Sequence, residues 1–349
     1  MKKTLRNWLA IASLPFMAVA TIPAAAGGDY LLATASTGGT YYPVGVALST
    51  LVKVKLQPGD KINLSAINSA GSGENIKLLR DNEVQFAILQ GLYGSYAWQG
   101  TGPLEKEGPQ KELRSVTMLW QNVEHFVVKS DYAKTGTMAD LAGLKGKPAG
   151  FGKKNSGTIG SNRKILSNLG IDLDKDFDLF YGGYGASASA LQDGKVDVIG
   201  TPAGVPVSAI TKAFAALGDG VTLLGFSDEE VAKADGGLGL WTPYVIAADT
   251  YPGQSKEVTT IAQPNFLAVR ADTAEDEVYL ITKTIYENLG FLKSIHKATS
   301  VMTLDQAIAG LPIPLHPGAA RYFQEVGLEI PENLIADSKD APSVAANRY

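Results

Sequence analysis

The sequence predicts an α/β protein built of two lobes. Along most of its 349 residues, short apolar segments alternate with segments in which apolar residues recur at helical spacing. This alternation is typical of mostly parallel sheets with helices on both faces. The pattern forms two blocks that are separated near Trp120, and a chain of this length is too large for one simple hydrophobic core. The two blocks therefore predict two lobes.

The first block contains three predicted strands and two predicted helices. Its strands are expected at residues 30–35, 62–67 and 84–89. The first helix is expected after residue 43, because apolar residues recur three and four positions apart from Val44 to Val52. The second helix is expected over residues 74–80. The loop before each helix is rich in Gly, Ser and Thr.

The second block repeats the alternation. Its strands are expected at residues 147–152, 178–181 and 196–200. Its helices are expected at residues 158–169 and 186–193, and Gly170 and Gly194 mark their ends. Ser227 and Glu230 have the spacing of a capping box, which predicts the start of a further helix.

The C-terminal part returns to the pattern of the first block. Strands are expected at residues 244–248 and 259–269, and a helix capped by residues 273–276 is expected to run to about Leu289. These elements form either a third domain or the completion of the first lobe, and we favour the second interpretation. The chain then crosses between the lobes near residues 120–123 and 240–244. Two crossings form a hinge, and closure about a hinge is a common way to enclose a ligand.

The N-terminal residues have the features of a secretory signal peptide. Lys2, Lys3 and Arg6 precede an uncharged run of 15 residues, and small residues at 24–26 supply a cleavage site. A membrane anchor is the alternative, but a span needs about 20 apolar residues. The predicted organisation is a signal peptide at 1–26, lobe 1 at 27–121 plus 243–330, lobe 2 at 122–242, and a loosely held C-terminal tail at 331–349.

Cysteine usage and charge narrow the setting of the mature chain. The sequence has no cysteine, so an exported product needs no disulfide and has no lipid-anchoring thiol. We therefore expect a free periplasmic protein. Loss of the three N-terminal cations changes the formal net charge from −4 to −7, which argues against nucleic acid or an acidic membrane as the partner. An anionic ligand must then be attracted by local groups.

Catalytic patterns are weak in this sequence. The three histidines, His125, His296 and His316, do not pair at metal-ligand spacing. Residues 183–188 fit a Gly-x-Gly-x-x-Ala pattern, but no acidic residue follows at the spacing of a dinucleotide site, and a plain strand–helix turn is the preferred interpretation. We expect no enzyme activity, no cofactor and no metal, and we expect His125 to be a strand residue.

Small-residue loops that enter helices are the strongest chemical signal. The loops at residues 37–40, 69–73 and 155–157 offer hydroxyls and free N–H groups at helix N-termini, where negative charge is favoured. In an open parallel sheet such loops gather at the carboxyl ends of the strands, where ligands bind. Tyr41 and Tyr93 are expected to flank the ligand. Arg163 either reaches a distal carboxylate or is solvated.

The motifs together resemble the TAXI family, the TRAP-transporter-associated extracytoplasmic immunogenic proteins. The resemblance rests on residues 36–45 (STGGTYYPVG), 69–75, 152–158, 190–198, 203–207, 251–254 and 316–322. These matches follow one another in order from about residue 30 to residue 327. The sequence departs from the family pattern at Gln90 to Tyr93 and at Pro264-Asn265, which affects the acid that is bound.

The resemblance implies a type II periplasmic-binding-protein fold, in which two α/β lobes are joined by a hinge with the ligand cleft between them. It also implies a monomeric solute receptor for a TRAP permease, with glutamate or 2-oxoglutarate as the type of ligand. A periplasmic sensor input for a histidine kinase is the alternative. His316 is expected to cap or pack a helix.

The predicted ligand-binding residues lie in loops at strand ends. They are Gly39, Thr40, Tyr41, Ser69, Gly71, Ser72, Asn75, Gln90, Tyr93, Ser156, Gly157, Thr158, Pro202, Ala203 and Gly204. Among them, the loop at residues 155–158 is expected to bind a ligand carboxylate directly, because Gly157 permits a close approach to the backbone.

Overall fold

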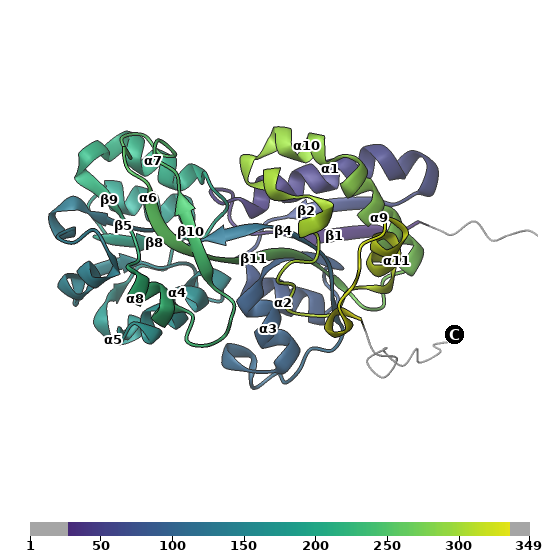
Figure 1. Ribbon diagram of the computed structural model, residues 1–349, viewed down its shortest axis with the longest axis horizontal. Coiled ribbons are helices and arrows are strands. Elements are labelled where there is room, and N and C mark those ends of the chain that lie inside the picture. The colour runs from purple at the N-terminus through teal and green to yellow at the C-terminus, as the bar shows by residue number, and fades with distance from the viewer. Residues whose placement is uncertain (1–26, 336–349) are drawn as a thin grey trace, which may run out of the picture.

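A computed structural model describes residues 27–335 and shows two lobes, each built around its own sheet (Figure 1). The six-stranded sheet has the order β10-β11-β3-β1-β2, and β4 pairs with β11 off this path. The five-stranded sheet has the order β7-β6-β8-β5-β9. The predicted two-lobed α/β class is confirmed. The predicted signal peptide and residues 336–349 lie outside the described residues.

The first lobe begins with the predicted strand–loop–helix units. Its elements are β1 (Asp29–Ala33), α1 (Tyr41–Asp60), β2 (Asn63–Ile67), α2 (Ser72–Arg80), β3 (Phe86–Gln90) and α3 (Gly91–Gln99). β1 pairs in parallel with both β2 and β3, so the loops after these three strands leave the same edge of the sheet.

The second lobe has the same construction. Its elements are β5 (Phe126–Lys129), β6 (Pro148–Gly150), α4 (Gly157–Asn168), α5 (Leu173–Asp176), β7 (Asp178–Leu179), α6 (Tyr184–Gln192), β8 (Val198–Gly200), α7 (Ser208–Leu217), β9 (Val221–Leu224) and α8 (Asp228–Ala234). β6 pairs in parallel with β7 and β8. The capping box predicted at Ser227 and Glu230 is confirmed at the start of α8.

Antiparallel pairing of β5 with β8 and β9 makes the five-stranded sheet mixed rather than mostly parallel. In the six-stranded sheet, long antiparallel strands that connect the lobes have the same effect. These strands are β4 (Leu113–Val123), β10 (Thr242–Ile246) and β11 (Val258–Arg270). β4 of the six-stranded sheet leads directly into β5 of the five-stranded sheet, close to the predicted crossing near residue 123. The hairpin of β10 and β11 differs from the prediction, because Tyr251 at its tip stacks on Phe214 of α7, with 5.8 Å between the ring centroids. Residues near this tip therefore pack on lobe 2, although they were expected in lobe 1.

The C-terminal helices cover the first sheet (Figure 1). They are α9 (Glu275–Glu287), α10 (Leu289–Ile295) and α11 (Pro317–Glu325). The predicted cap at the start of α9 is wrong: the N-cap residue is Ala274, and the buried Thr273 hydroxyl has no hydrogen-bond partner. The 3₁₀ helices of the described chain are Gly102–Leu104, Ser130–Tyr132, Met138–Leu144, Gly218–Gly220, Lys297–Val301, Leu304–Gln306 and Glu332–Leu334.

Residues near the C-terminal end of the described chain are held in place. His316 caps α11 by accepting from the Gly318 N–H at 3.2 Å, which confirms its predicted capping role. Leu334 is buried, and its carbonyl accepts from the Leu315 N–H at 2.9 Å. The start of the predicted loose tail is therefore packed against lobe 1.

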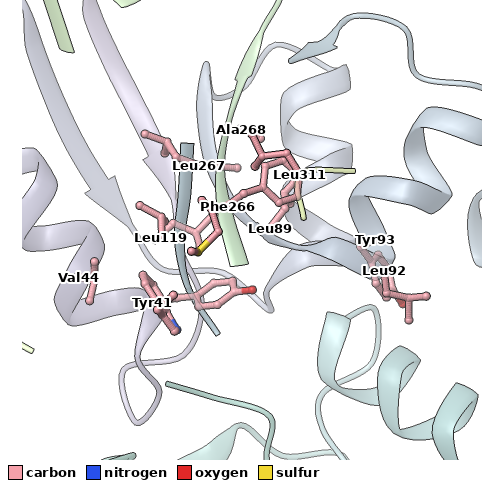
Figure 2. Close-up of a cluster of buried hydrophobic side chains, with 14 of the residues drawn as sticks. Tyr41, Val44, Leu89, Leu92, Tyr93, Leu119, Phe266, Leu267, Ala268 and Leu311 are labelled. Carbon is pink, nitrogen blue, oxygen red and sulfur yellow. The ribbon is translucent and has the colours of Figure 1, made fainter. Parts of the chain in front are cut away.

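The core of the first lobe lies directly behind the strand ends. Figure 2 shows Leu89 of β3, Leu119 of β4 and Phe266 of β11 gathered in this core, with Tyr41 at the start of α1 beside them. Each of the three apolar side chains is fully buried. Such dense packing holds the loops at the strand ends in fixed positions. Within residues 27–335, no helix has the length and apolar character needed to cross a membrane.

Candidate ligand-binding site

A cavity lies between the two lobes. In lobe 1 its walls are the segments that follow β1, β2 and β3, and in lobe 2 they are the segments that follow β6, β7 and β8. Asn122, at the end of β4, adds a wall at the hinge. The cavity thus lies at the carboxyl ends of the parallel strands of both lobes, where this kind of sheet binds its ligands.

The structure brings most of the predicted site residues together around this cavity. Those that line it are Gly39, Thr40, Tyr41, Gly71, Ser72, Gln90, Ser156, Gly157, Thr158, Pro202 and Ala203. Four predicted residues do not line it, namely Ser69, Asn75, Tyr93 and Gly204. Each of these four has a different role that its hydrogen bonds explain.

Ser69 and Asn75 hold the strand ends rather than the cavity wall. The Asn75 side-chain Nδ2 donates to the carbonyls of Thr34 at 2.8 Å and Ile88 at 2.9 Å, which ties the ends of β1 and β3 together. The Ser69 hydroxyl donates to Asn75 Oδ1 at 2.6 Å. Both side chains are buried, so they support the binding loops from behind.

Tyr93 and Gly204 take part in contacts between the lobes. The Tyr93 hydroxyl donates to the Ser156 carbonyl at 3.3 Å, and the Gly204 carbonyl accepts from the Thr40 hydroxyl at 3.0 Å. Figure 2 places Tyr93 away from Tyr41 and beside a helix of the other lobe. Tyr93 thus helps to close the cleft and does not line the cavity beside Tyr41, and its contact with the ligand stays a prediction.

Hydrogen bonds across the cleft hold the lobes in a closed arrangement. They run from Thr40 to Gly204 at 3.0 Å, from Gln90 Nε2 to the Gly157 carbonyl at 2.9 Å, from Tyr93 to Ser156 at 3.3 Å, and from Ser208 to the Gly38 carbonyl at 3.0 Å. We call these bonds the latch. Gly157 permits a close approach of the lobes, because a Cβ added to it would lie 2.9 Å from Gln90 Cδ and from Ser72 Cβ.

The loop before α4 has both of its hydroxyl groups engaged within the protein. The Ser156 hydroxyl caps α4 by accepting from the Ile159 N–H at 3.2 Å and donates to the Lys153 carbonyl at 2.7 Å. The Thr158 hydroxyl lies 3.0 Å from the Tyr184 hydroxyl. The N–H groups of Gly157 and Thr158 are in the first turn of the helix, where the backbone offers donors without intrahelical partners. Backbone donors, rather than hydroxyls, are thus what this loop offers to an anion.

Lys153 supplies the positive charge that the sequence interpretation lacked. Among the described residues that line the cavity, it is the one basic or acidic residue. It lies in the loop that the sequence marked as anion-binding, yet a lone lysine in a loop is usually solvated, so the sequence contained no signal that singled it out.

Tyr184 replaces Tyr93 as the second aromatic wall. It begins α6, and its hydroxyl donates to the Pro202 carbonyl. Burial raises the pKa of Tyr184 and of Tyr41, so both phenols stay neutral and act through hydrogen bonds. The glycines on either side of Tyr184 form the predicted strand–helix turn, and that turn was the available signal for its position.

Arg163 takes the solvated role. It forms an ion pair with Asp174 at 2.7 Å, and it lines a second pocket between the lobes rather than the cavity that Lys153 lines. Because its side chain is substantially exposed, this pair contributes little to stability.

Two buried titratable groups lie at the crossing between the lobes. Glu124 Oε1 accepts from Trp241 Nε1 at 3.2 Å, and burial raises the pKa of this carboxyl to about 8. His125 Nε2 lies 2.7 Å from the Tyr251 hydroxyl, and burial lowers its pKa to about 4. Both groups are therefore neutral at pH 7 in the closed arrangement. Within residues 27–335, no group of three or more His, Asp or Glu side chains is placed to hold a metal ion.

Several solved structures are similar to this chain. A protein of Bordetella bronchiseptica RB50 is 12% identical, with 87% of this chain and 85% of that chain covered and a TM-score of 0.51. A binding-protein component of a phosphonate ABC transporter from Pseudomonas aeruginosa is 10% identical, with 77% and 78% covered and a TM-score of 0.49. The alkanesulfonate-binding protein SsuA of Xanthomonas axonopodis pv. citri, bound to MOPS, is 13% identical, with 85% and 83% covered and a TM-score of 0.43.

At these identities the similarity concerns the fold alone, which here is two α/β lobes, each with its own sheet. Family membership comes from the sequence itself. The sequence model of the NMT1-like family matches residues 32–327, a range that includes every segment that lines the cavity. The chain therefore belongs to the NMT1-like family.

Proposed function

We propose that this protein is a periplasmic solute receptor that captures a small organic anion between its lobes and delivers it to a membrane permease. The observation that carries the proposal is the cavity between the closed lobes, whose wall contains Lys153 and the N-termini of two helices. A site that is enclosed by a hinge suits capture and release of an intact ligand.

The cavity wall favours a negative charge at one end of the ligand. Helices α4 and α6 begin at Gly157 and Tyr184, and both residues line the cavity. The N-terminus of a helix carries a partial positive charge and free N–H donors, and Lys153 adds a full charge beside them. Tyr41 offers apolar ring surface for a short carbon chain.

The finer proposal is a carboxylate of the glutamate or 2-oxoglutarate type and a TRAP permease as the membrane partner. It is supported by the sequence motifs that resemble the TAXI family, several of which form the cavity wall. The receptor is proposed to act as a monomer, without a cofactor and without turnover of the ligand. The alternative partner is a sensor histidine kinase, since the same ligand-driven closure would serve either one.

Calorimetry on the purified mature chain tests the proposal. We expect tight binding of at least one four- to six-carbon oxo, hydroxy or amino acid, no binding of a neutral sugar, and recovery of the acid intact. Lys153→Met should weaken binding about 10- to 150-fold, because a hydrogen bond to a charged group contributes about 1.5–3 kcal/mol.

Lys154→Met is the matched control, since the Lys154 ammonium lies over the Tyr181 ring at 4.9 Å and does not line the cavity. This variant should bind as the wild type does. Selective sugar binding, or equal losses in the two variants, would contradict the proposed anion site.

A further inference from the structure

Two side-chain amides form a relay from lobe 2 to the hinge wall of the cavity. Gln90 Nε2 donates to the Gly157 carbonyl at 2.9 Å, and Asn122 Nδ2 donates to Gln90 Oε1 at 3.3 Å. A backbone carbonyl can only accept, so Gln90 must direct its NH₂ group toward lobe 2 and its oxygen toward Asn122. Asn122 must then direct its own NH₂ group toward Gln90.

This relay fixes the remaining atom of the Asn122 amide. Its Oδ1 has no hydrogen-bond partner among the described residues, the side chain is 2% exposed, and Asn122 lines the cavity. A buried acceptor without a donor is unfavourable, and buried polar atoms in folded proteins nearly always have a partner. The orientation of the relay means that the missing partner is a donor, which an occupant of the cavity can provide.

The position of Gln90 is fixed, so the orientation of its amide determines the orientation of the Asn122 amide. Its backbone N–H donates to the Ser72 hydroxyl at 3.1 Å, and its side chain is almost fully buried between the lobes. Asn122 lies in β4 opposite Gln263 of β11, so its backbone is fixed in the sheet. If the Asn122 amide were flipped, its Oδ1 would face Gln90 Oε1, so two acceptors would meet and the hydrogen bond between these side chains would be lost.

We propose that Asn122 Oδ1 accepts a hydrogen bond from the ligand, so that the receptor selects carboxylates bearing a hydroxyl or amino group over the matching oxo acids. This inference rests on the proposed anion-binding function and adds the second recognition element. The carboxylate lies toward Lys153 and the helix N-termini, and the donor lies toward Asn122. Because the relay starts at the Gly157 carbonyl of lobe 2, the acceptor is oriented only when the lobes are closed.

A matched set of acids tests the selection. Glutamate, 2-hydroxyglutarate and 2-oxoglutarate share one carbon skeleton and differ at a single position, and the equivalent four-carbon set is used if the wild type binds it more tightly. We expect the hydroxy or amino acid to bind at least about tenfold more tightly than the oxo acid, because the oxo acid leaves the buried acceptor unpaired. Equal affinities in the wild type would overturn the inference, since an ordered water would then be serving Asn122.

Variants assign the preference to the relay. Asn122→Leu should reduce the ratio of the two affinities to about one, and Gln90→Leu should reduce it as well by freeing the Asn122 amide to rotate. Asn162→Leu is the control, because Asn162 is a buried amide of lobe 2 that also has an unpartnered Oδ1 but does not line the cavity. It should lower the melting temperature and keep the wild-type ratio.

The outcomes separate this inference from the proposed function. An unchanged ratio in Asn122→Leu, in a variant whose melting shows that it is folded, overturns the role of Asn122 while leaving the carboxylate site intact. Failure of every acid to bind the folded wild type refutes the proposed function, and the inference falls with it.

Discussion

Adding one methyl group at Gly157 should prevent the lobes from closing fully. A Cβ at this position would lie 2.9 Å from Gln90 Cδ and from Ser72 Cβ, both in the opposite lobe. Carbon atoms pack best at about 3.5–4.0 Å, so the lobes would have to separate by roughly 0.6–1 Å at this point. That movement would stretch the 2.9 Å bond from Gln90 to the Gly157 carbonyl beyond hydrogen-bond length.

The expected loss follows from the latch bonds near this glycine. The bond at Gly157 and the adjacent bond from Tyr93 to Ser156 would both be weakened or lost. Each contributes about 0.5–1.5 kcal/mol, so the closed arrangement should lose about 1–3 kcal/mol. If the ligand is bound in the closed arrangement, Gly157→Ala should weaken its binding roughly 5- to 150-fold.

Calorimetry and thermal melting of the ligand-free protein together distinguish this effect from misfolding. Gly157 begins helix α4 with an ordinary backbone conformation, so alanine should not destabilise lobe 2. Gly185→Ala is the matched control, since it is also in the first turn of a helix near the cavity but an added Cβ there meets nothing within 4 Å. The reasoning is refuted if Gly157→Ala binds the ligand as tightly as Gly185→Ala does.

Three further predictions concern residues outside the cavity. Burial raises the pKa of Glu124 from 4.5 to about 8, so between these pH values the folded protein keeps a proton that the unfolded chain releases. The free energy of unfolding, measured by denaturation, should therefore fall as the pH rises through this window. The same pH dependence of the free energy of unfolding in a Glu124→Gln variant would contradict this explanation. His316→Ala should reduce the free energy of unfolding by about 0.5–2 kcal/mol through loss of the α11 cap, with ligand affinity unchanged by calorimetry. Arg163→Ala should also leave affinity unchanged, because Arg163 pairs with Asp174, and a measured loss would place it in the site after all.

Much of the fold and part of the site could be predicted because they depend on local sequence. Strands, helices and the small-residue loops between them follow from periodicity and turn chemistry, and parallel pairing then gathers the loops at one edge of each sheet. Residues such as Gly157 and Thr158 were found in this way. The packing of Tyr251, in the turn between β10 and β11, on lobe 2 could not be predicted, because it involves residues far apart in the sequence.

The remaining site residues could not be predicted because tertiary packing decides their roles. Asn75 was taken for a binding residue, since a buried amide that ties two strands together has the same local sequence as one that contacts a ligand. Asn122 was missed because it ends a strand with no glycine-rich loop after it. Tyr184 was missed and Tyr93 was expected at the cavity, because the relative placement of the lobes, and not the sequence around each tyrosine, determines which ring faces the cavity.

The latch places different demands on its two sides. Its donors are side chains, at Thr40, Gln90, Tyr93 and Ser208, whereas every acceptor in it is a main-chain carbonyl. Substitution of an accepting residue leaves the carbonyl in place, so these positions tolerate changes in chemistry but not in bulk. The donor positions tolerate changes in bulk more readily than they tolerate loss of the donating hydrogen. The strength of closure can therefore be adjusted in small steps through the donors other than Gln90, independently of the groups that contact the ligand carboxylate, so that related receptors can differ in affinity while binding the same solute.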